Sequence, residues 1–333
     1  MKVSVIILNW NGQHLLPDCF ESLKRQTYSN FEVILVDNGS TDGSVDYLKS
    51  LDFTFLKPLF LDSNRGFAGG NNSALPLVEG EIIALLNNDA RPTPTWIAAA
   101  VARIQNGADM VACRILKADG KTIDKAGHLI FRDGLNRGYG TGRLDGADFD
   151  QALEALWPDG CAAFYRREIM DRIGFLDEDF FLYGEDADFG FRARNAGFNC
   201  MYEPESKVLH LQSASLGKFN PQKIYYVERN RIFLLIKNFP LDWIALSPWY
   251  TLKRYLMNVF SIGSGRGAAA GFSREQSKLV LARVLLHATW SGIVGIPKML
   301  RKRRNFQAQI SRRQLKQLLN RFRINTRSLT LDD

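Results

Sequence analysis

The sequence predicts an α/β fold with a mostly parallel central sheet, followed by a basic helical region. Over residues 1–90, short apolar runs alternate with segments of helical spacing, and polar residues directly follow several of these runs. Short apolar runs without internal alternation are typical of strands covered on both faces. Their alternation with helices indicates right-handed βαβ units.

The elements are expected in a regular order along the chain. Strands are predicted at 3–8, 31–36, 54–61 and 81–86. The helices between them are predicted at 14–26, through Val45, Leu48 and Leu51, and, after a loop at 63–70, at 71–78. Residues 110–150 show short strands and glycine-rich turns, and later helices are expected at 166–173 and 186–196.

Composition narrows the class of protein. The 333 residues, 46% hydrophobic and 23% charged, are enough for one large globular domain with an appendage. The cysteines lie far apart without metal-finger spacing, which predicts buried free thiols in a reducing compartment. The start of the sequence runs directly into a strand pattern, so we expect no secretion signal. The four cysteines are Cys19, Cys113, Cys161 and Cys200.

Charge is distributed unevenly along the chain. Residues 221–333 hold 21 Lys and Arg against 5 Asp and Glu, a balance of +16, whereas residues 1–220 carry −8. We therefore expect two parts, a mildly acidic domain at 1–220 and a basic amphipathic helical region at 221–333. Such a region suits an anionic partner, either phospholipid or nucleic acid.

Two stretches of the basic region are apolar, at 243–262 and 279–297, but both contain charged residues. A spanning helix needs about 20 apolar residues, and Arg283 within the second stretch disfavours spanning. The pattern favours helices that lie in the membrane interface, flanked by the basic run at 298–304. A packed helical subdomain with a solvated basic face is the alternative.

Two polar sites follow strands of the expected sheet, at the edge where ligands of such sheets bind. Asp37 ends the second strand and can accept a hydrogen bond from the N3–H of uracil or thymine. The alternative is an Asx turn. Asn87, Asn88 and Asp89 follow the fourth strand. Asp89 suits a divalent cation beside a diphosphate, although a polar strand end is also possible on position alone.

Further candidate site residues lie between residues 185 and 210. Glu185, Asp186 and Asp188 begin a helix after an aromatic run at 180–183, and they exceed what helix capping requires. A carboxylate there is suited to take the proton of an attacking acceptor hydroxyl. His210 lies in an apolar, strand-like run, where a core histidine and a metal ligand are both open readings.

Together these segments resemble the inverting glycosyltransferases called family 2, which have the GT-A fold. The resemblance covers about residues 1–215, implies that 1–220 form the catalytic domain, and rests on several motifs in the family's order. They are VIILNWNG at 5–12, VDNGSTDGS at 36–44, NRGFAGGNN at 64–72, NND at 87–89, WPDG at 157–160 and ED at 185–186.

The resemblance implies a role for each matching residue. Asp37 would bind the base of a dTDP- or UDP-linked sugar, and Asp89 and His210 would hold the Mg²⁺ or Mn²⁺ that bridges its diphosphate. Asp186 would be the general base, with Glu185 shaping the site. The other donor-binding positions are Asn9, Asn11, Asn64, Gly66, Gly70, Asn87 and Asn88. The acceptor-binding positions are Trp157, Asp159 and Gly160.

One position departs from the family pattern. The triplet usually carries Asp at both ends, whereas this sequence has Asn87. Asn87 can still hydrogen-bond a ribose hydroxyl but adds no charge, so we expect a weak metal site until donor phosphates are bound. This variant, together with GFAGGN at 66–71, looks most like bacterial rhamnosyltransferases of surface polysaccharide assembly.

The resemblance also implies partners. We expect a polyprenyl-diphosphate-linked saccharide as acceptor, an anionic membrane surface and no nucleic acid, which would put the protein peripherally on the cytoplasmic face of the bacterial inner membrane. Homo-oligomerisation is left open. The competing interpretations are a nucleotidyltransferase acting on sugar phosphates and a non-catalytic membrane- or polysaccharide-binding protein. A processive synthase is disfavoured because the sequence has no Gln-x-x-Arg-Trp motif.

Overall fold

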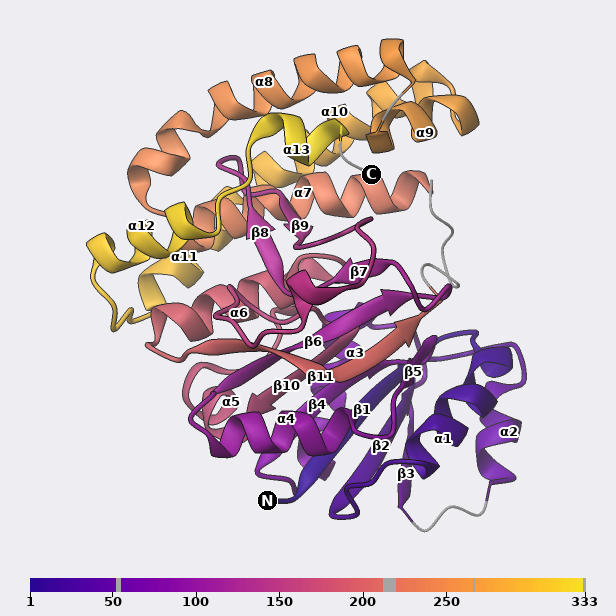
Figure 1. Ribbon diagram of the computed structural model, residues 1–333. Coiled ribbons are helices and arrows are strands. Elements are labelled where there is room, and N and C mark those ends of the chain that lie inside the picture. Colours follow the sequence, from indigo (N-terminus) through magenta and orange to yellow (C-terminus); the bar gives the residue numbers. More distant parts are fainter. Residues whose placement is uncertain (52–54, 212–219, 266, 332–333) are drawn as a thin grey trace. The chain divides into compact units, whose positions relative to one another are not determined.

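A computed structural model describes residues 1–51, 55–211, 220–265 and 267–331 (Figure 1). The chain divides into two compact units. Unit 1 comprises residues 1–127, 138–194 and 198–215, and unit 2 comprises residues 128–137, 195–197 and 216–333. The assignment of residues 1–220 to catalysis and 221–333 to membrane association stays a prediction.

Unit 1 is built on a nine-stranded sheet of order β3-β2-β1-β4-β10-β6-β11-β5, with β7 paired to β6. β1 pairs in parallel with β2 and β4, and β2 with β3, while β10 runs antiparallel between β4 and β6. The strands are β1 (Val3–Asn9), β2 (Phe31–Asp37), β3 (Leu56–Phe60), β4 (Ile82–Asn87), β5 (Ala90–Pro92), β6 (Met110–Lys117), β7 (Ile123–Lys125), β10 (Ala162–Arg166) and β11 (Cys200–His210).

Helices cover both faces of this sheet. On one face, α1 (Leu16–Lys24) and α4 (Trp96–Gln105) pack on alternate residues of the strands, and Trp96 lies 4.6 Å from Phe164 between ring centroids. On the other face, α3 (Gly66–Ser73) lies against β1, and α6 (Glu185–Asn195) packs on β10 through Phe189 and Tyr165. The remaining helices of unit 1 are α2 (Ser44–Lys49) and α5 (Arg167–Ile173). The four cysteines are buried and free.

The predicted order of strands and helices is confirmed, with differences in position. The loop expected at 63–70 and the helix expected at 71–78 were wrong, because the glycine-rich segment itself forms α3 and a 3₁₀ turn follows at Leu75–Leu77. Gly70 permits this close packing, since a Cβ there would lie 2.4 Å from Leu8 Cδ1 of β1. Thr54, the first residue of the third predicted strand, lies outside the described residues.

Unit 2 contains the helices of the basic region and a short hairpin of β8 (His128–Ile130) and β9 (Asn136–Gly138), whose last residue belongs to unit 1. No described helix is by itself long and apolar enough to cross a membrane; α10 and α11 reach that length and composition together, but are bent by 45°. The helices are α7 (Pro221–Asn238), α8 (Leu241–Ser264), α9 (Gly267–Glu275), α10 (Lys278–Val294), α11 (Ile296–Asn305), α12 (Arg312–Arg321) and α13 (Thr326–Leu331).

Candidate active site

The ends of β1, β2 and β4 are joined by the side chain of Asn9. Its Nδ2 donates to Asp37 Oδ2 at 3.0 Å, and its Oδ1 accepts from Asn88 Nδ2 at 2.8 Å. Asp37 Oδ1 also accepts from the backbone N–H of Ser40 at 2.9 Å, so the Asx turn considered from the sequence is present. Asn9 is fully buried. It therefore positions Asp37 and Asn88 rather than presenting its own amide.

Loops beyond these strands are held by further amides. Asn11 has a φ of +50° and accepts from Thr41 N at 2.7 Å, which fixes the loop after β2. Asn64 accepts from Gly66 N at 2.8 Å and from Asn38 Nδ2 at 3.1 Å. Asn38 was not singled out from the sequence, although it is buried and also accepts from Arg65 N at 2.9 Å.

Gly66 is where the backbone conformation requires glycine. Its φ is +71°, and a Cβ would lie 2.3 Å from the carbonyl oxygen of Phe181. That carbonyl accepts from Phe67 N at 2.7 Å. The first turn of α3 is thereby tied to the aromatic segment that precedes α6.

Asp89 and His210 lie together, as predicted. Antiparallel pairing of β5 with β11 sets His210 opposite Ala90, and Asp89 Oδ1 lies 3.3 Å from His210 Nε2. On the other side of the ring, His210 Nδ1 is 2.8 Å from Oδ2 of Asp124, a buried residue of β7. Asp124 was missed because nothing in the sequence connects a three-residue strand to a histidine 86 positions later.

The donor set of Asp89 and His210 fits a divalent cation. Asp89 Oδ1 is buried and accepts no hydrogen bond within the described residues. Its 3.3 Å separation from His210 Nε2 suits two atoms that each bind one ion at about 2.0–2.2 Å. Metal-binding histidines usually direct their second ring nitrogen at a carboxylate, which is the place of Asp124.

The acidic pair begins α6. Gly160 N donates to Asp186 Oδ2 at 3.2 Å, and a Cβ on Gly160 would lie 3.6 Å from that of Asp186. Glu185 is buried, and its Oε2 makes no hydrogen bond to described residues. Burial, reinforced by the Asp186 carboxylate, raises the pKa of Glu185 well above its usual range.

Lys125, also missed from the sequence, connects the two halves of the site. Its Nζ donates to Asp159 Oδ2 at 2.5 Å, and Asp159 Oδ1 accepts from Cys161 N at 2.9 Å. Burial opposes the charged lysine, but the carboxylates of Asp159 and Asp124 outweigh it and raise the pKa of Lys125. Burial likewise opposes the charged His210, yet Cys161, Asp124 and Asp89 hold its pKa above the usual value.

Some predicted residues have little or no exposed surface at the site. Trp157 is fully buried and packs on Phe191 with ring centroids 4.9 Å apart, so its ring has no surface for an acceptor. Gly70 faces the sheet, as described above. Asn87 is half-buried at the end of β4, where its N–H donates to Cys161 O at 2.9 Å.

The sequence profile of glycosyl transferase family 2 matches residues 4–174, half of the chain. The chain belongs to this family. The match spans the strand ends that carry Asn9, Asp37 and Asp89, the Asp124 strand and the Asp159 loop. Glu185, Asp186 and His210 lie beyond it.

Curated relatives of this family 2 chain include two bacterial proteins. The O-antigen biosynthesis protein RfbC of Myxococcus xanthus is 29% identical over 226 residues, which cover 64% of this chain and 18% of RfbC. The UDP-Glc:alpha-D-GlcNAc-diphosphoundecaprenol beta-1,3-glucosyltransferase WfgD of Escherichia coli is 31% identical over 96 residues, which cover 29% of this chain and 36% of WfgD. The chain thus spans well under two thirds of either relative.

Solved structures show the same architecture. The mannosyltransferase PcManGT from Pyrobaculum calidifontis, in complex with GDP-Man and Mn²⁺, superposes with a TM-score of 0.55 at 16% identity, covering 89% of this chain and 87% of PcManGT. The GT-A-like α/β fold with a mostly parallel central sheet, predicted from the sequence, is therefore confirmed for this family 2 chain.

Proposed function

We propose that this protein is a metal-dependent inverting glycosyltransferase that uses a nucleotide-diphosphate sugar. One observation carries the proposal: contacts between side chains and adjacent backbone positions connect the predicted base with the predicted metal ligands. Asp186 contacts Gly160, and the adjacent Asp159 contacts Lys125. Asp124, which directly precedes Lys125, contacts His210, and His210 lies beside Asp89.

The chemistry divides between these groups. The acceptor oxygen attacks the anomeric carbon of the donor sugar and passes its proton to the Asp186 carboxylate, while the bond from that carbon to the diphosphate oxygen breaks. Glu185, buried beside Asp186, shapes the site around this base. Lys125 donates to Asp159 and so helps to hold the loop whose Gly160 contacts Asp186.

Asp89 and His210 would hold the cation, with Asp124 orienting the imidazole. When bound, it neutralises charge on the departing nucleoside diphosphate. Of the two ions expected from the sequence, Mn²⁺ is the first to test. The Mn²⁺ in PcManGT is consistent with this choice.

The acceptor we propose is a polyprenyl-diphosphate-linked saccharide in bacterial surface polysaccharide synthesis. RfbC is named for O-antigen biosynthesis, and WfgD is named for an acceptor sugar on diphosphoundecaprenol. Asp37 would bind the uracil or thymine base of the donor. Rhamnose on dTDP is the first donor to test, with UDP-sugars next.

The experiment is nucleotide release from dTDP- and UDP-sugars, with and without a GlcNAc-diphospho-lipid acceptor, in Mn²⁺ or EDTA. We expect acceptor-dependent release in Mn²⁺ that EDTA abolishes. Asp171→Asn, an exposed carboxylate of α5, is the matched control for substitutions at Asp186.

Two outcomes would contradict the proposal. Release that is undiminished in EDTA would remove the metal from the reaction. Formation of pyrophosphate from a nucleoside triphosphate and a sugar phosphate, with no glycosyl transfer from any donor, would favour a nucleotidyltransferase.

A further inference from the structure

Helix α8 buries polar side chains and exposes apolar ones. Its buried positions include Ser247, Arg254 and Ser261. Its exposed positions between residues 246 and 260 are mostly large and apolar. Six of these side chains are 48–68% exposed, namely Leu246, Trp249, Leu252, Leu256, Val259 and Phe260. A helix whose outer side meets water normally has the opposite arrangement.

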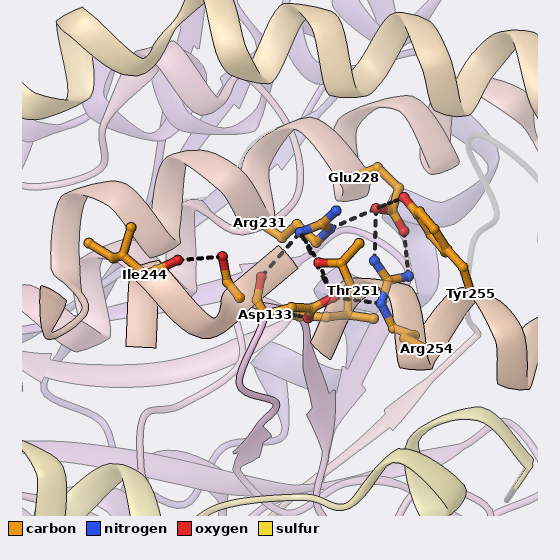
Figure 2. A network of polar contacts seen from close by, with 9 residues as sticks. Asp133, Glu228, Arg231, Ile244, Thr251, Arg254 and Tyr255 are labelled. Atoms are coloured by element: carbon orange, nitrogen blue, oxygen red, sulfur yellow. Dashed lines mark hydrogen bonds and ion pairs between the residues drawn. The ribbon is translucent and has the colours of Figure 1, made fainter. Parts of the chain in front are cut away.

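A buried ion network fixes which side of α8 faces outward (Figure 2). Arg254 donates to both oxygens of Glu228, at 2.7 and 3.0 Å, and to Asp133 Oδ2 at 2.7 Å. Arg231 donates to Glu228 Oε2 at 2.7 Å, and Tyr255 donates to the same oxygen at 3.0 Å. Turning α8 over would leave these buried charges unpaired, which is strongly unfavourable.

Helix α10 repeats this asymmetry beside α7. Its inner side packs on α7, where a Cβ on Gly292 would lie 2.5 Å from Ile232 Cδ1 and Tyr225 OH donates to Ser291 Oγ at 3.1 Å. Its outer side is exposed and apolar. The side chains, 41–84% exposed, are Leu279, Val280, Leu286, Trp290, Ile293 and Val294.

The two helices flank the same neighbour. At 100° per residue, Glu228 and Arg231 of α7 point toward α8, and Tyr225 and Ile232 point to the adjoining side, toward α10. Each helix thus presents exposed apolar side chains three or four positions apart, an arrangement that marks an interaction site. By length and composition, α10 alone does not qualify as a membrane-spanning helix.

The charge of this part of the chain indicates which partner covers the apolar sides of α8 and α10. Residues 243–331 contain 17 Lys and Arg and one acidic residue, Glu275. A second copy of the chain would bring like charges together, which disfavours pairing. An anionic phospholipid surface provides both an apolar layer and the opposite charge. Exposed tryptophans such as Trp249 and Trp290 prefer the interface of a bilayer.

We propose that the outward sides of α8 and α10 lie in the headgroup layer of an anionic phospholipid bilayer without crossing it. Arg283 is exposed among the apolar residues of α10, at a depth where its guanidinium can reach phosphates. The exposed Lys298, Arg301 and Arg304 of α11 add further positive charge. The inference concerns unit 2 alone and stands without the proposed function.

The test is co-sedimentation of the full chain with vesicles of phosphatidylcholine, either alone or mixed with phosphatidylglycerol. We expect stronger binding to the mixed vesicles and partial release by salt. Trp249→Ser, Leu256→Ser and Phe260→Ser combined should weaken binding roughly 10-fold or more, since several CH₂ groups leave the lipid. Leu286→Ser with Trp290→Ser tests α10 separately.

The matched control is Leu144→Ser with Leu153→Ser, which removes exposed apolar side chains from unit 1 and should leave binding unchanged. Melting temperatures verify that each variant folds. Quenching of tryptophan emission by brominated phospholipid tests the unaltered protein without any substitution. UDP binding should be the same in all variants, which separates this test from that of the catalytic proposal.

Three results would overturn the inference. The first is equal binding of the protein to neutral and mixed vesicles. The second is undiminished vesicle binding by α8 and α10 variants that fold normally. The third is that the protein binds no vesicles but self-associates, and that the α8 variant abolishes this self-association. The last would assign the apolar sides to a second copy of the chain.

Discussion

Replacing Asp124 with asparagine tests the arrangement of the proposed metal site most directly. The substitution keeps the shape of the side chain but removes the charge that faces His210 Nδ1 at 2.8 Å. Asp124 is 3% exposed, so the contact is shielded from water. A hydrogen bond to a charged group contributes about 1.5–3 kcal/mol, and the asparagine carbonyl retains part of it.

The expected effect on metal affinity follows from these figures. Loss of an outer carboxylate that orients a metal-binding histidine typically weakens metal binding about 10–100-fold, or roughly 1.4–2.7 kcal/mol. We expect Asp124→Asn near the lower end and Asp124→Ala near the upper end. The assay is titration of Mn²⁺ by calorimetry in the presence of UDP, with Asp171→Asn as the control.

A double-substitution cycle distinguishes orientation of the histidine from a general structural effect. In a His210→Ala background, Asp124→Asn should cause little further loss, because the ring it orients is gone. Unchanged Mn²⁺ affinity in a folded Asp124→Ala protein would refute the reasoning. So would equal losses in the presence and absence of His210.

The remaining predictions concern catalysis and stability. Asp186→Asn should lower transfer about 10²–10⁴-fold while UDP affinity stays the same; full activity in the folded variant would exclude Asp186 as the base. Burial would raise the pKa of Glu32, but hydrogen bonds from neighbouring lysines and Ser4 lower it from 4.5 to about 2. The stabilisation by ionised Glu32 is therefore present above pH 4.5 and lost toward pH 2. In urea unfolding, the free energy of Glu32→Gln should be lower than that of the wild type at neutral pH and equal to it in acid. A difference that does not change with pH would contradict this prediction. Arg254→Met leaves buried Glu228 without its main partner and should lower the free energy of unfolding by roughly 3–5 kcal/mol. Arg301→Met, at an exposed position, should lower it little. Equal losses in the two variants would show that the buried network does not stabilise the fold.

Local sequence signals were enough to predict β1, β2 and β4, because each is a short apolar run that ends in a polar residue. They failed at α3, where glycine disfavours a helix by about 1 kcal/mol per residue in isolation. Contact of Gly70 with Leu8 of β1 overrides that preference, and such a contact is invisible along the sequence. Helix α4 was not expected at all, although its apolar residues have helical spacing.

The residues of the candidate site also divide into those that local sequence motifs indicate and those that depend on contacts distant in the sequence. Asp37, Asp89 and Asp186 were found because each directly follows a strand or begins a helix in a recognisable motif. Asp124 and Lys125 were missed because their partners come from distant segments and their own strand is three residues long. Trp157 was assigned to the acceptor by motif alone, whereas burial against Phe191 gives it a packing role.

The hydrogen bonds of the Asn9 amide limit which residues can replace it. Its nitrogen must face Asp37 and its oxygen must face Asn88, so the group cannot flip without losing both bonds. An aspartate at position 9, nearly identical in shape, would still accept from Asn88 but would repel the Asp37 carboxylate. Natural variation at this fully buried position is therefore constrained by the charge of its neighbour, and an exchange to aspartate should be viable only if position 37 changes with it.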